Sequence, residues 1–317
     1  MQVSAQKIVV LGTGGTIAGT AAQAGDNIGY TAAQVGVGEL LAAVPGLQAL
    51  AGGPLVVEQV AQIDSKDMEH GVWRALALRC AECLADPAVR GVVITHGTDT
   101  IEETAWFLHS VLDATKPVVL TCAMRPSTAL VPDGPQNLLD AVAVAASTGA
   151  QGVVVVAAGA IHGAQRVQKV HPYRVDPFSS GDAGPLGWVE EGAVRLVQGW
   201  PAVSQGKGLA AMQNQTADAP WPWVELVVSH AGASGRAVDA LVRDGVQGLV
   251  VACTGNGTLH HALEAALLRA QAVGVRVVRA TRCPEGQLLP TPGNALVAAP
   301  GLSPVKARIS LVLDLLG

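Results

Sequence analysis

Hydroxyl and carboxylate side chains gather in two glycine-containing segments of the 317-residue chain. Residues 12–19 read Gly-Thr-Gly-Gly-Thr-Ile-Ala-Gly, and residues 96–100 read His-Gly-Thr-Asp-Thr. Glycine lets backbone N–H groups approach a ligand closely, and Thr16 adds a hydroxyl to the first segment. Thr98 beside Asp99 is a pair that could hold or transfer a proton. Because a threonine hydroxyl needs a neighbouring base to become a nucleophile, these residue types predict nucleophilic catalysis by threonine.

The first segment has two other interpretations. A dinucleotide-binding loop fits it poorly, because the G-x-G-x-x-G pattern read from Gly12 has Ile17 at its last position. No Lys-Ser or Lys-Thr pair follows, as a phosphate-binding loop would require. A tight turn between a strand and a helix would explain the glycines, but it would not explain Thr16 among them.

The second segment also fits a helix start, with Asp99 or Thr100 as the N-cap and Glu103 completing a capping box. A third segment, residues 122–127, follows an apolar run and reads Cys-Ala-Met-Arg-Pro-Ser. Its backbone N–H groups could face an anion or an oxyanion. The alternative is an ordinary loop with Arg125 on the surface.

Histidine and cysteine spacing does not favour metal or redox chemistry. None of the eight histidines lies in an H-E-x-x-H motif or a comparable spacing, and His260-His261 fits a solvated helix start. The five cysteines are an odd, scattered set rather than a disulfide framework. Cys80 and Cys83 form a C-x-x-C on one helical face with Trp73, and no second C-x-x-C completes a zinc site, so we interpret them as core residues. We expect no metal and no cofactor.

Composition narrows the possible partners and the location. The formal net charge is −5 and aromatic residues make up only 3%, which disfavours binding to phosphate backbones or stacked bases. The longest apolar stretch, residues 152–161, is far shorter than the ~20 residues of a membrane-spanning helix. Residues 1–7 lead directly into an apolar run without the pattern of a signal peptide, so we expect a cytoplasmic location.

Short apolar runs alternate with helical patterns along most of the chain. We predict strands at residues 8–11, 91–96, 117–121, 152–157, 224–229, 248–252 and 275–279. We predict helices at residues 67–85, 101–113, 136–147, 234–244 and 258–273, with a last helix that begins near Pro304 and has Ser303 as its N-cap. This alternation predicts an α/β fold with a mostly parallel sheet. Since ligands bind beyond the carboxyl ends of such strands, the three segments should meet at one edge.

The alternation stops at Trp200-Pro201. Residues 200–223 are rich in Pro, Gly, Ser, Gln and Asn, which is typical of a domain boundary. We therefore predict a larger N-terminal α/β domain over residues 1–199, a linker over 200–223 and a smaller C-terminal α/β domain over 224–317.

Residues 13–18 and 95–100 together resemble the two signatures of the bacterial-type L-asparaginase/glutaminase family. The similarity continues through matching motifs at residues 30–31, 64–68, 123–127, 133–138, 185–187 and 304–308, and so covers nearly the whole chain. The resemblance implies hydrolysis of the side-chain amide of L-asparagine. It also implies a homotetramer, with each site formed between the N-terminal domain of one subunit and the C-terminal domain of another.

The resemblance also implies a role for each matching residue. Thr16 would be the nucleophile that forms an aspartyl ester and releases ammonia, and Tyr30 would be its activating hydroxyl. Thr98, Asp99 and Lys169 would form the second catalytic group, with Thr98 and Asp99 also contacting the substrate and Asp99 binding its ammonium group.

The remaining implied contacts are Ser65 to the α-carboxylate of the substrate, Ala123 as a backbone donor to the oxyanion, and Gly15 as a further substrate-binding residue. Water would then hydrolyse the ester. Residues 20–29 are expected to act as a flexible lid that closes over the substrate and excludes water.

Three positions depart from the family pattern. Lys66 stands where the family usually has Gln or Glu near the substrate ammonium. Gly232 stands where many members have Asn. The C-terminal segment, in which members often carry a catalytic glutamate, is shorter here, and Glu285 is the only carboxylate residue between Glu264 and Asp314. We therefore expect a strong preference for asparagine and low glutaminase activity.

Three alternative functions remain. A non-catalytic amino-acid sensor on the same fold would bind asparagine without releasing ammonia. A dinucleotide-dependent enzyme would bind a nucleotide at residues 12–19. A subunit of a tRNA-linked amidotransferase shares the signatures, but it would need an added N-terminal domain or a basic surface, and the sequence shows neither.

Overall fold

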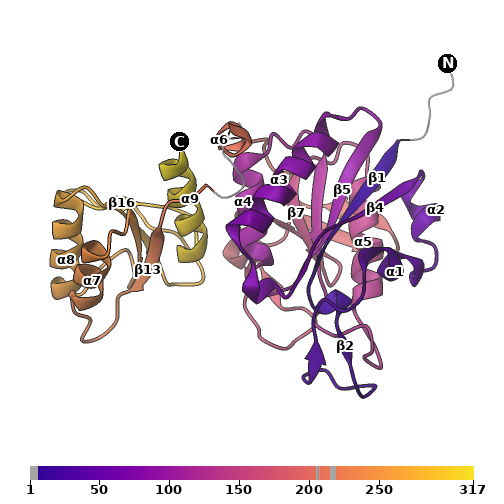
Figure 1. The fold of residues 1–317 in the computed structure, drawn as a ribbon, viewed down its shortest axis with the longest axis horizontal. Helices are drawn as coiled ribbons and strands as arrows, with labels where there is room; N and C mark the ends of the chain where they lie inside the picture. Colours follow the sequence, from indigo (N-terminus) through magenta and orange to yellow (C-terminus); the bar gives the residue numbers. More distant parts are fainter. Residues whose placement is uncertain (1–5, 205, 207, 215–218) are drawn as a thin grey trace. The chain divides into compact units, whose positions relative to one another are not determined.

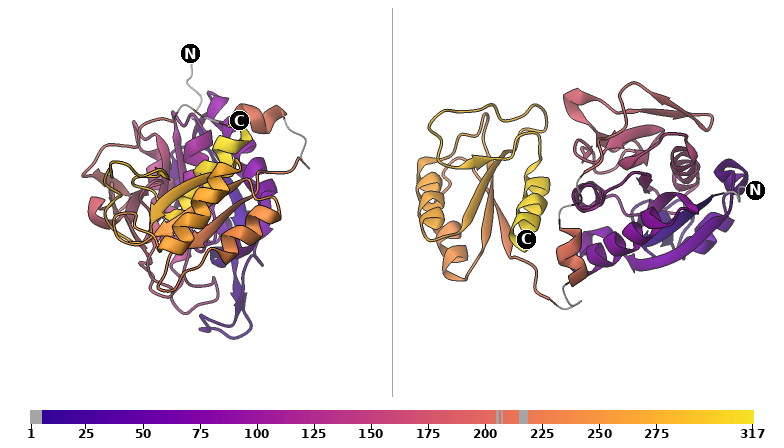
Figure 2. Two further views of the ribbon diagram at one scale, coloured as in Figure 1. Left: turned by 90° about the vertical axis from the view of Figure 1, so that its left-hand side faces the viewer. Right: turned by 90° about the horizontal axis from the view of Figure 1, so that it is seen from above.

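The computed structural model describes residues 6–204, 206, 208–214 and 219–317. The chain forms two compact units, Met1–Leu209 and Ala210–Gly317 (Figures 1 and 2). The division after Leu209 falls inside the segment predicted as a linker, which also contains the short helix α6 (Leu209–Asn214). Within the described part of the chain, no helix is both long enough and apolar enough to cross a membrane.

The first unit is built on an eight-stranded sheet with the order β12-β11-β8-β7-β6-β5-β1-β4. The strands are β1 (Lys7–Gly14), β4 (Leu55–Ile63), β5 (Val89–Thr95), β6 (Pro117–Thr121), β7 (Gly152–Ala157), β8 (Ala160–Gly163), β11 (Gly187–Glu190) and β12 (Ala193–Leu196). The pairs from β4 through β1, β5 and β6 to β7 are all parallel, whereas β7, β8, β11 and β12 pair antiparallel. The central strands are buried along most of their length, as their nearly continuous apolar sequences predict.

Helices cover both faces of this sheet (Figure 1). They are α1 (Val37–Ala42), α2 (Leu47–Ala51), α3 (His70–Ala85), α4 (Ile101–Val111) and α5 (Gly134–Ala146). Helices α1, α2 and α5 pack on the face that carries Ile8, Val10 and Val154. Helices α3 and α4 pack together and against β4, β5 and β7. The alternation of side chains along each strand therefore supplies an apolar surface to both helical layers.

The second unit has a four-stranded parallel sheet with the order β13-β14-β15-β16. Its elements are β13 (Val224–Val228), α7 (Arg236–Arg243), β14 (Gly248–Cys253), α8 (His261–Ala272), β15 (Arg276–Thr281), β16 (Val297–Ala298) and α9 (Pro304–Leu316). Leu249 and Val251 face α7 and α8, whereas Val250 faces α9. The predicted fold class, a larger mostly parallel α/β unit followed by a smaller α/β unit, is confirmed.

The sequence did not predict four strands of the large sheet. Strand β4 lies at the edge and is mostly half-exposed or exposed, so it lacks the continuous apolar pattern of its neighbours. Strands β8, β11 and β12 have four residues each, too few for a period to stand out. Ala158 and Gly159 both have positive φ, and they join β7 to β8 through a two-residue hairpin turn.

Four of the six predicted helix starts differ from the structure by two or three residues, since α3 begins at His70, α5 at Gly134, α7 at Arg236 and α8 at His261; the starts of α4 at Ile101 and α9 at Pro304 agree. Helix α3 begins at His70 rather than residue 67, because Ser65–Asp67 form a separate 3₁₀ turn. Ser303 does occupy the N-cap position of α9. Its hydroxyl makes no cap hydrogen bond, and among the described residues it is buried without a partner.

Candidate active site

The order β6-β5-β1 brings three loops together at the carboxyl edge of the large sheet. Thr16 follows β1, Thr98 follows β5 and Ala123 follows β6. Parallel strands end at the same edge, so segments that are far apart in sequence become neighbours there. Ala123 packs with Ile17 and Ala18 in one apolar cluster, which ties the third loop to the first.

Thr16 is held against Tyr30 by a short hairpin. Thr16 begins a 3₁₀ turn, Thr16–Ala18, directly after β1, and it is only 8% exposed. Strands β2 (Thr20–Ala21) and β3 (Tyr30–Thr31) then pair antiparallel and return the chain toward Thr16. The Oγ1 atom of Thr16 lies 2.7 Å from the Tyr30 hydroxyl. The two hydroxyls are hydrogen-bonded at this distance, and either oxygen can be the donor.

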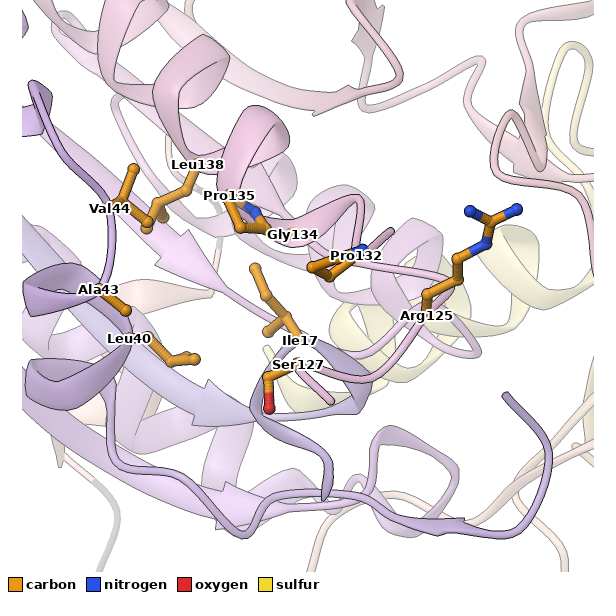
Figure 3. Close-up of a pocket in the computed structure, with 10 residues that line it drawn as sticks. All are labelled: Ile17, Leu40, Ala43, Val44, Arg125, Ser127, Pro132, Gly134, Pro135 and Leu138. Atoms are coloured by element: carbon orange, nitrogen blue, oxygen red, sulfur yellow. The ribbon is translucent and has the colours of Figure 1, made fainter. Parts of the chain in front are cut away.

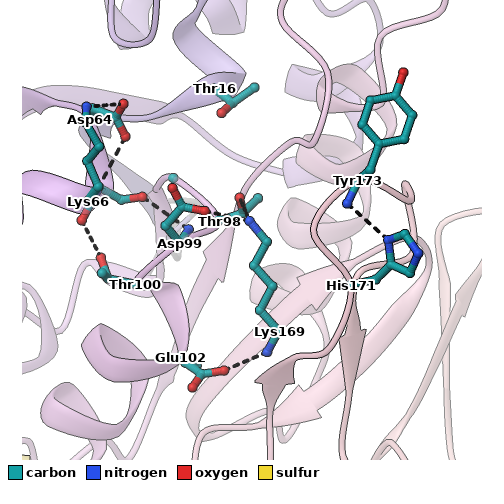
Figure 4. A network of polar contacts seen from close by, with 12 residues as sticks. Thr16, Asp64, Lys66, Thr98, Asp99, Thr100, Glu102, Lys169, His171 and Tyr173 are labelled. Carbon is teal, nitrogen blue, oxygen red and sulfur yellow. Dashed lines mark hydrogen bonds and ion pairs between the residues drawn. The ribbon is translucent and has the colours of Figure 1, made fainter. Parts of the chain in front are cut away.

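Lys169 joins Thr98 and Asp99 into a second cluster (Figure 4). Its Nζ donates to Thr98 Oγ1 at 2.7 Å and to Asp99 Oδ1 at 2.6 Å. The Lys169 side chain is 18% exposed and that of Asp99 is 53% exposed, so this ion pair is open to solvent on the carboxylate side. A cation bonded to the Thr98 oxygen makes loss of the hydroxyl proton less costly.

The position of Lys169 depends on two further contacts. It lies on β9 (Gln168–Lys169), which pairs antiparallel with β10 (Phe178–Ser179). Its backbone N–H donates to the Glu102 carboxylate at 2.6 Å, which ties β9 to the start of α4. His171 Nδ1 accepts from the N–H groups of Tyr173 and Arg174, both at 3.0 Å, and shapes the turn that follows (Figure 4). Glu102 was not predicted as a site residue, since its position beside Glu103 suggested only a helix start.

Ser65 connects the 3₁₀ turn Ser65–Asp67 to the loop after β5. It is 2% exposed, and its Oγ accepts the N–H of Asp99 at 3.2 Å. Its carbonyl oxygen accepts the hydroxyl of Thr100 at 2.7 Å. Thr100 holds the N-cap position of α4, as one of the two predicted alternatives, but its side chain makes no cap hydrogen bond. The threonine half of the predicted capping box is therefore absent, and the Thr100 hydroxyl donates to Ser65 across the site.

Two glycines let these loops approach each other at backbone distance. A Cβ on Gly15 would overlap the backbone of Gly97, and a Cβ on Gly97 would overlap Ser65 Oγ. Gly15 also has φ +84°, in the left-handed region that favours glycine. Its N–H donates to the Ile63 carbonyl and its own carbonyl accepts from Ala18, so its polar backbone groups are already used within the fold.

The loop after β6 is organised by an internal carboxylate. Asp133 accepts the N–H of Met124 and the N–H of Arg125, both at 2.9 Å. These two N–H groups are therefore occupied, and the expectation that they face a bound anion is wrong for them. The Arg125 guanidinium donates to the Val131 carbonyl at 3.0 Å and lies at the surface of the loop.

Lys66 is paired with its neighbours in the chain. Its Nζ lies 2.7 Å from Asp64 Oδ2 and 3.2 Å from Asp67 Oδ2. The hydrogen bond to Asp64, followed by that to Asp67, raises the pKa of the Lys66 ammonium, which therefore stays charged. The cation next to Ser65 is thus balanced locally by carboxylates.

The predicted lid is an ordered hairpin with contacts to the loop after β6. Ser127 donates to the Gly19 carbonyl through both its N–H and its hydroxyl, at 3.0 and 2.8 Å. Asp26 Oδ1 accepts the N–H groups of Ile28 and Gly29 at the tip, where Ile28 is 80% exposed. Closure of this hairpin over a substrate stays a prediction.

An apolar pocket of about 250 Å³ lies beside the 3₁₀ turn that begins with Thr16 (Figure 3). Ile17 enters this pocket, and Leu40, Val44 and Leu138 line it. A Cβ on Gly134 would lie only 2.9 Å from Ile17 Cγ1, so the start of α5 packs closely against Ile17. Arg125 and Ser127 also line the pocket, so it has two polar side chains beside its apolar ones.

Cysteines and histidines do not add a metal centre to this site. Across the ranges that the structure describes, no group of three or more His, Cys, Asp or Glu could hold a metal ion. Cys80 and Cys83 are free and buried, and burial raises the pKa of both thiols, which confirms their interpretation as core residues. His260 caps α8, since its Nδ1 accepts the N–H of Ala262.

His96 is a buried residue that the sequence analysis left without a role. It is fully buried at the end of β5, directly before Gly97. Its Nδ1 lies 2.8 Å from the Gly97 carbonyl and its Nε2 lies 2.9 Å from Thr104 Oγ1. Burial lowers the pKa of His96 to about 4, so the ring is neutral at physiological pH. The segment His-Gly-Thr-Asp was singled out in the sequence, but nothing in it predicts the contacts of His96.

The fold and site thus define a two-domain α/β protein with one threonine hydroxyl bonded to a tyrosine and a second bonded to a lysine, at the edge of its large sheet. Comparison with known proteins gives a consistent result. Residues 7–201 match the family model described as Asparaginase, N-terminal, and residues 223–316 match the Glutaminase/Asparaginase C-terminal domain. The chain therefore belongs to the asparaginase family.

Similar proteins span most of the chain. L-asparaginase 2 of Escherichia coli (strain K12) is 38% identical, and the match covers 97% of this chain and 88% of that protein. The glutaminase-asparaginase of Pseudomonas fluorescens biotype A is 36% identical, over 97% of this chain and 86% of that protein. A crystal structure described as a probable cytoplasmic L-asparaginase from Campylobacter jejuni matches with a TM-score of 0.88 and 37% identity, covering 98% of this chain and 95% of that one.

Gly97→Ala is expected to destabilise the protein, because the added Cβ overlaps Ser65 Oγ in a fully packed contact. The free energy of unfolding should fall by about 1–3 kcal/mol, the usual cost of overpacking. Gly71→Ala is the matched control, since a Cβ there meets no atom within 4 Å and the position is inside α3. Urea denaturation measures both variants, and equal midpoints would contradict the packing argument.

Stability is expected to decrease as the pH falls from about 6.5 toward about 4. The unfolded chain takes up a proton on His96 near its ordinary pKa of 6.5, whereas the folded protein resists protonation down to about 4. Between these two pH values, the contribution of His96 to the free energy of unfolding falls by about 1.4 kcal/mol for each pH unit. His96→Asn removes the titrating group, so its unfolding midpoint should depend less on pH. A pH dependence identical to that of the wild type would rule out this contribution.

Proposed function

We propose that this protein hydrolyses the side-chain amide of L-asparagine to L-aspartate and ammonia through a threonine nucleophile and a covalent acyl-enzyme intermediate. The observation that carries the proposal is the 2.7 Å contact between Thr16 and Tyr30 at the carboxyl end of β1, in a chain of the asparaginase family. The names of the relatives, L-asparaginase and glutaminase-asparaginase, support an amide of this size as substrate.

In the first step Thr16 Oγ1 attacks the amide carbon and its proton passes to the Tyr30 oxygen, while the proton of the Tyr30 hydroxyl passes on to the amide nitrogen. The tetrahedral intermediate then collapses, the C–N bond breaks, and the amide nitrogen leaves as ammonia with that proton. An ester between Thr16 and the aspartyl group remains. A water molecule attacks this ester, gives its proton back to the Thr16 oxygen, and releases L-aspartate. A positioned proton acceptor of this kind contributes about 10²–10⁴ in rate.

The second cluster supplies charge and binding. Lys169 holds Thr98 and Asp99 in one arrangement and stabilises negative charge at Thr98 Oγ1. Only one carboxylate oxygen of Asp99 bonds to Lys169, which leaves the other for the ammonium group of the substrate. Ser65 Oγ accepts from the Asp99 N–H, so its own proton is available for the α-carboxylate.

Ala123 and Gly15 complete the proposed contacts. The N–H of Ala123 is proposed as the donor to the oxyanion, because it lies at the end of β6 beside the turn that carries Thr16. The backbone polar groups of Gly15 are used within the fold, and its lack of a side chain lets the loop that carries Thr16 lie against Gly97.

A dinucleotide is a poor fit to the loop after β1. The N–H groups of Gly15, Ala18 and Gly19 donate to carbonyls of the protein itself, at 2.9, 3.2 and 2.8 Å. A pyrophosphate would need such groups free and pointing from the start of a longer helix, whereas Thr16–Ala18 is a single 3₁₀ turn.

An amino-acid sensor would use the same residues to bind asparagine. Release of ammonia from asparagine distinguishes the enzyme from the sensor.

The proposed preference for asparagine over glutamine follows from two positions at which the chain departs from the family pattern. Lys66 brings a cation to a position that family members use for the substrate ammonium, although Asp64 balances it. Gly232 has φ +72°, a conformation that Asn also tolerates, so it keeps the backbone shape while the amide is lost. With fewer contacts to the substrate backbone, the longer glutamine side chain is positioned less well.

A homotetramer with sites completed between subunits and a cytoplasmic location are part of the same proposal. The relatives support both cytoplasmic and periplasmic locations, since one is named a probable cytoplasmic and another a probable periplasmic L-asparaginase. Light scattering coupled to size-exclusion chromatography tests the assembly, and a mass below that of four chains would overturn it.

Thr16→Ala is expected to reduce ammonia release from L-asparagine by at least ~10³-fold, because no other group replaces the nucleophile. Thr16→Ser keeps a hydroxyl and is the matched control, for which acid quenching during turnover should trap the chain with one added aspartyl group. Mass spectrometry of the quenched protein locates that group. Binding of asparagine without ammonia release by the wild type would support the sensor instead.

The ratio of kcat/KM for asparagine to that for glutamine is expected to exceed about tenfold, within the range that one methylene provides. Lys66→Gln should bring the two values closer by removing the cation beside Ser65. Lys7→Gln is the control, since Lys7 pairs with Asp86 at the amino end of β1. Comparable values for the two amides in the wild type would contradict the proposed preference.

A further inference from the structure

A chain of three buried side chains ends on the peptide that carries Thr98. Trp73 on α3 is 5% exposed, Thr104 on α4 is fully buried, and His96 at the end of β5 is fully buried. Trp73 Nε1 donates to Thr104 Oγ1 at 2.9 Å, and Thr104 Oγ1 lies 2.9 Å from His96 Nε2. His96 Nδ1 lies 2.8 Å from the Gly97 carbonyl oxygen. The three contacts form one continuous path through three elements.

The groups at the two ends of this path allow only one arrangement of protons along it. The indole of Trp73 can only donate, so the Thr104 oxygen accepts there and its own proton points to His96 Nε2. The Gly97 carbonyl can only accept, so the proton of the neutral ring must be on Nδ1. The chemistry of the two terminal groups therefore fixes the tautomer of His96 and the direction of each bond. Stacking of Trp73 on Phe107, with centroids 4.9 Å apart, fixes the indole itself.

The peptide that receives the last bond has little freedom to move. Gly97 is packed between Gly15 and Ser65 so closely that neither side leaves room for a Cβ. The next residue is Thr98, whose hydroxyl must meet Lys169 at 2.7 Å. A rotation of the Gly97–Thr98 peptide would shift the Thr98 backbone and with it the hydroxyl.

We infer that Trp73, Thr104 and His96 act as a positioning relay that holds the Gly97–Thr98 peptide, and through it the Thr98 hydroxyl, in line with Lys169. His96 does not touch the substrate, so it is a positioning residue that acts through the backbone. The inference rests on the proposed function for its effect on turnover, but the proton arrangement stands independently of that function.

The proton arrangement is tested by nuclear magnetic resonance of the full-length protein labelled with ¹⁵N-histidine. His96→Asn identifies the His96 signals by their disappearance. The expected result is a neutral ring with its proton on Nδ1 that does not titrate between pH 7 and pH 5. A proton on Nε2, or a normal titration in this range, would overturn the relay whatever the enzyme activity is.

The effect on turnover is tested with two matched pairs. His96→Asn keeps a side-chain N–H near Nδ1, and Thr104→Ser keeps the hydroxyl, so both should retain most of kcat for asparagine. His96→Leu and Thr104→Val lose the relay and should lower kcat by roughly ten- to a hundredfold with KM little changed. Rates are expressed per folded protein, from the near-ultraviolet circular dichroism.

The relay would also be overturned if His96→Leu and Thr104→Val folded and kept the kcat of the wild type. If either fails to fold, Trp73→Phe provides a milder variant that keeps the stacking on Phe107 and should give a smaller loss of kcat. If the wild type released no ammonia from asparagine, the proposed function would fail, and the resonance experiment alone would still support or overturn the relay.

Discussion

The candidate active site depends on the close approach of three backbone segments at Gly15, Gly97 and Ser65. At these positions neither glycine leaves space for a Cβ, so the loops after β1 and β5 lie against each other and against the turn after β4. The parallel order of β4, β1 and β5 makes this contact possible, because the three strands end at the same edge. The hydroxyls of Thr16 and Thr98 project from the loops on either side of it. Their proximity is thus a property of the backbone as much as of the side chains.

Beside this contact between the loops lies the mostly buried ammonium group of Lys169. Lys169 bonds to Thr98 and Asp99 through its side chain and to Glu102 through its backbone, so one residue joins β9, α4 and the loop after β5. A lysine with two oxygen partners loses fewer rotamers when a substrate arrives than a free one would. Lys66, by contrast, is exposed and balanced by Asp64 and Asp67.

The site also shows how buried polar groups position exposed ones. The relay from Trp73 to the Gly97 carbonyl is complete, so the cost of burying a histidine and a threonine is offset by three hydrogen bonds. Asp133 does the same for the loop after β6 by binding two N–H groups. In both cases a polar side chain inside the fold determines the shape of a loop at the sheet edge.

The sequence by itself determined the alternating α/β pattern, the approximate bounds of the central strands, and the two Gly-Thr segments, because long apolar runs and glycines signal burial and close approach locally. It did not determine β4 or the short antiparallel strands, whose residues are half-exposed or too few to show a period. The resemblance grouped Tyr30 with Thr16 and Lys169 with Thr98, but only the tertiary structure gave their contacts, since these partners are 14 and 71 residues apart and their meeting depends on hairpins and strand order. Thr100 is a similar case: local sequence predicts its N-cap position, but only the fold shows that its hydroxyl donates to the carbonyl of Ser65, 35 residues away.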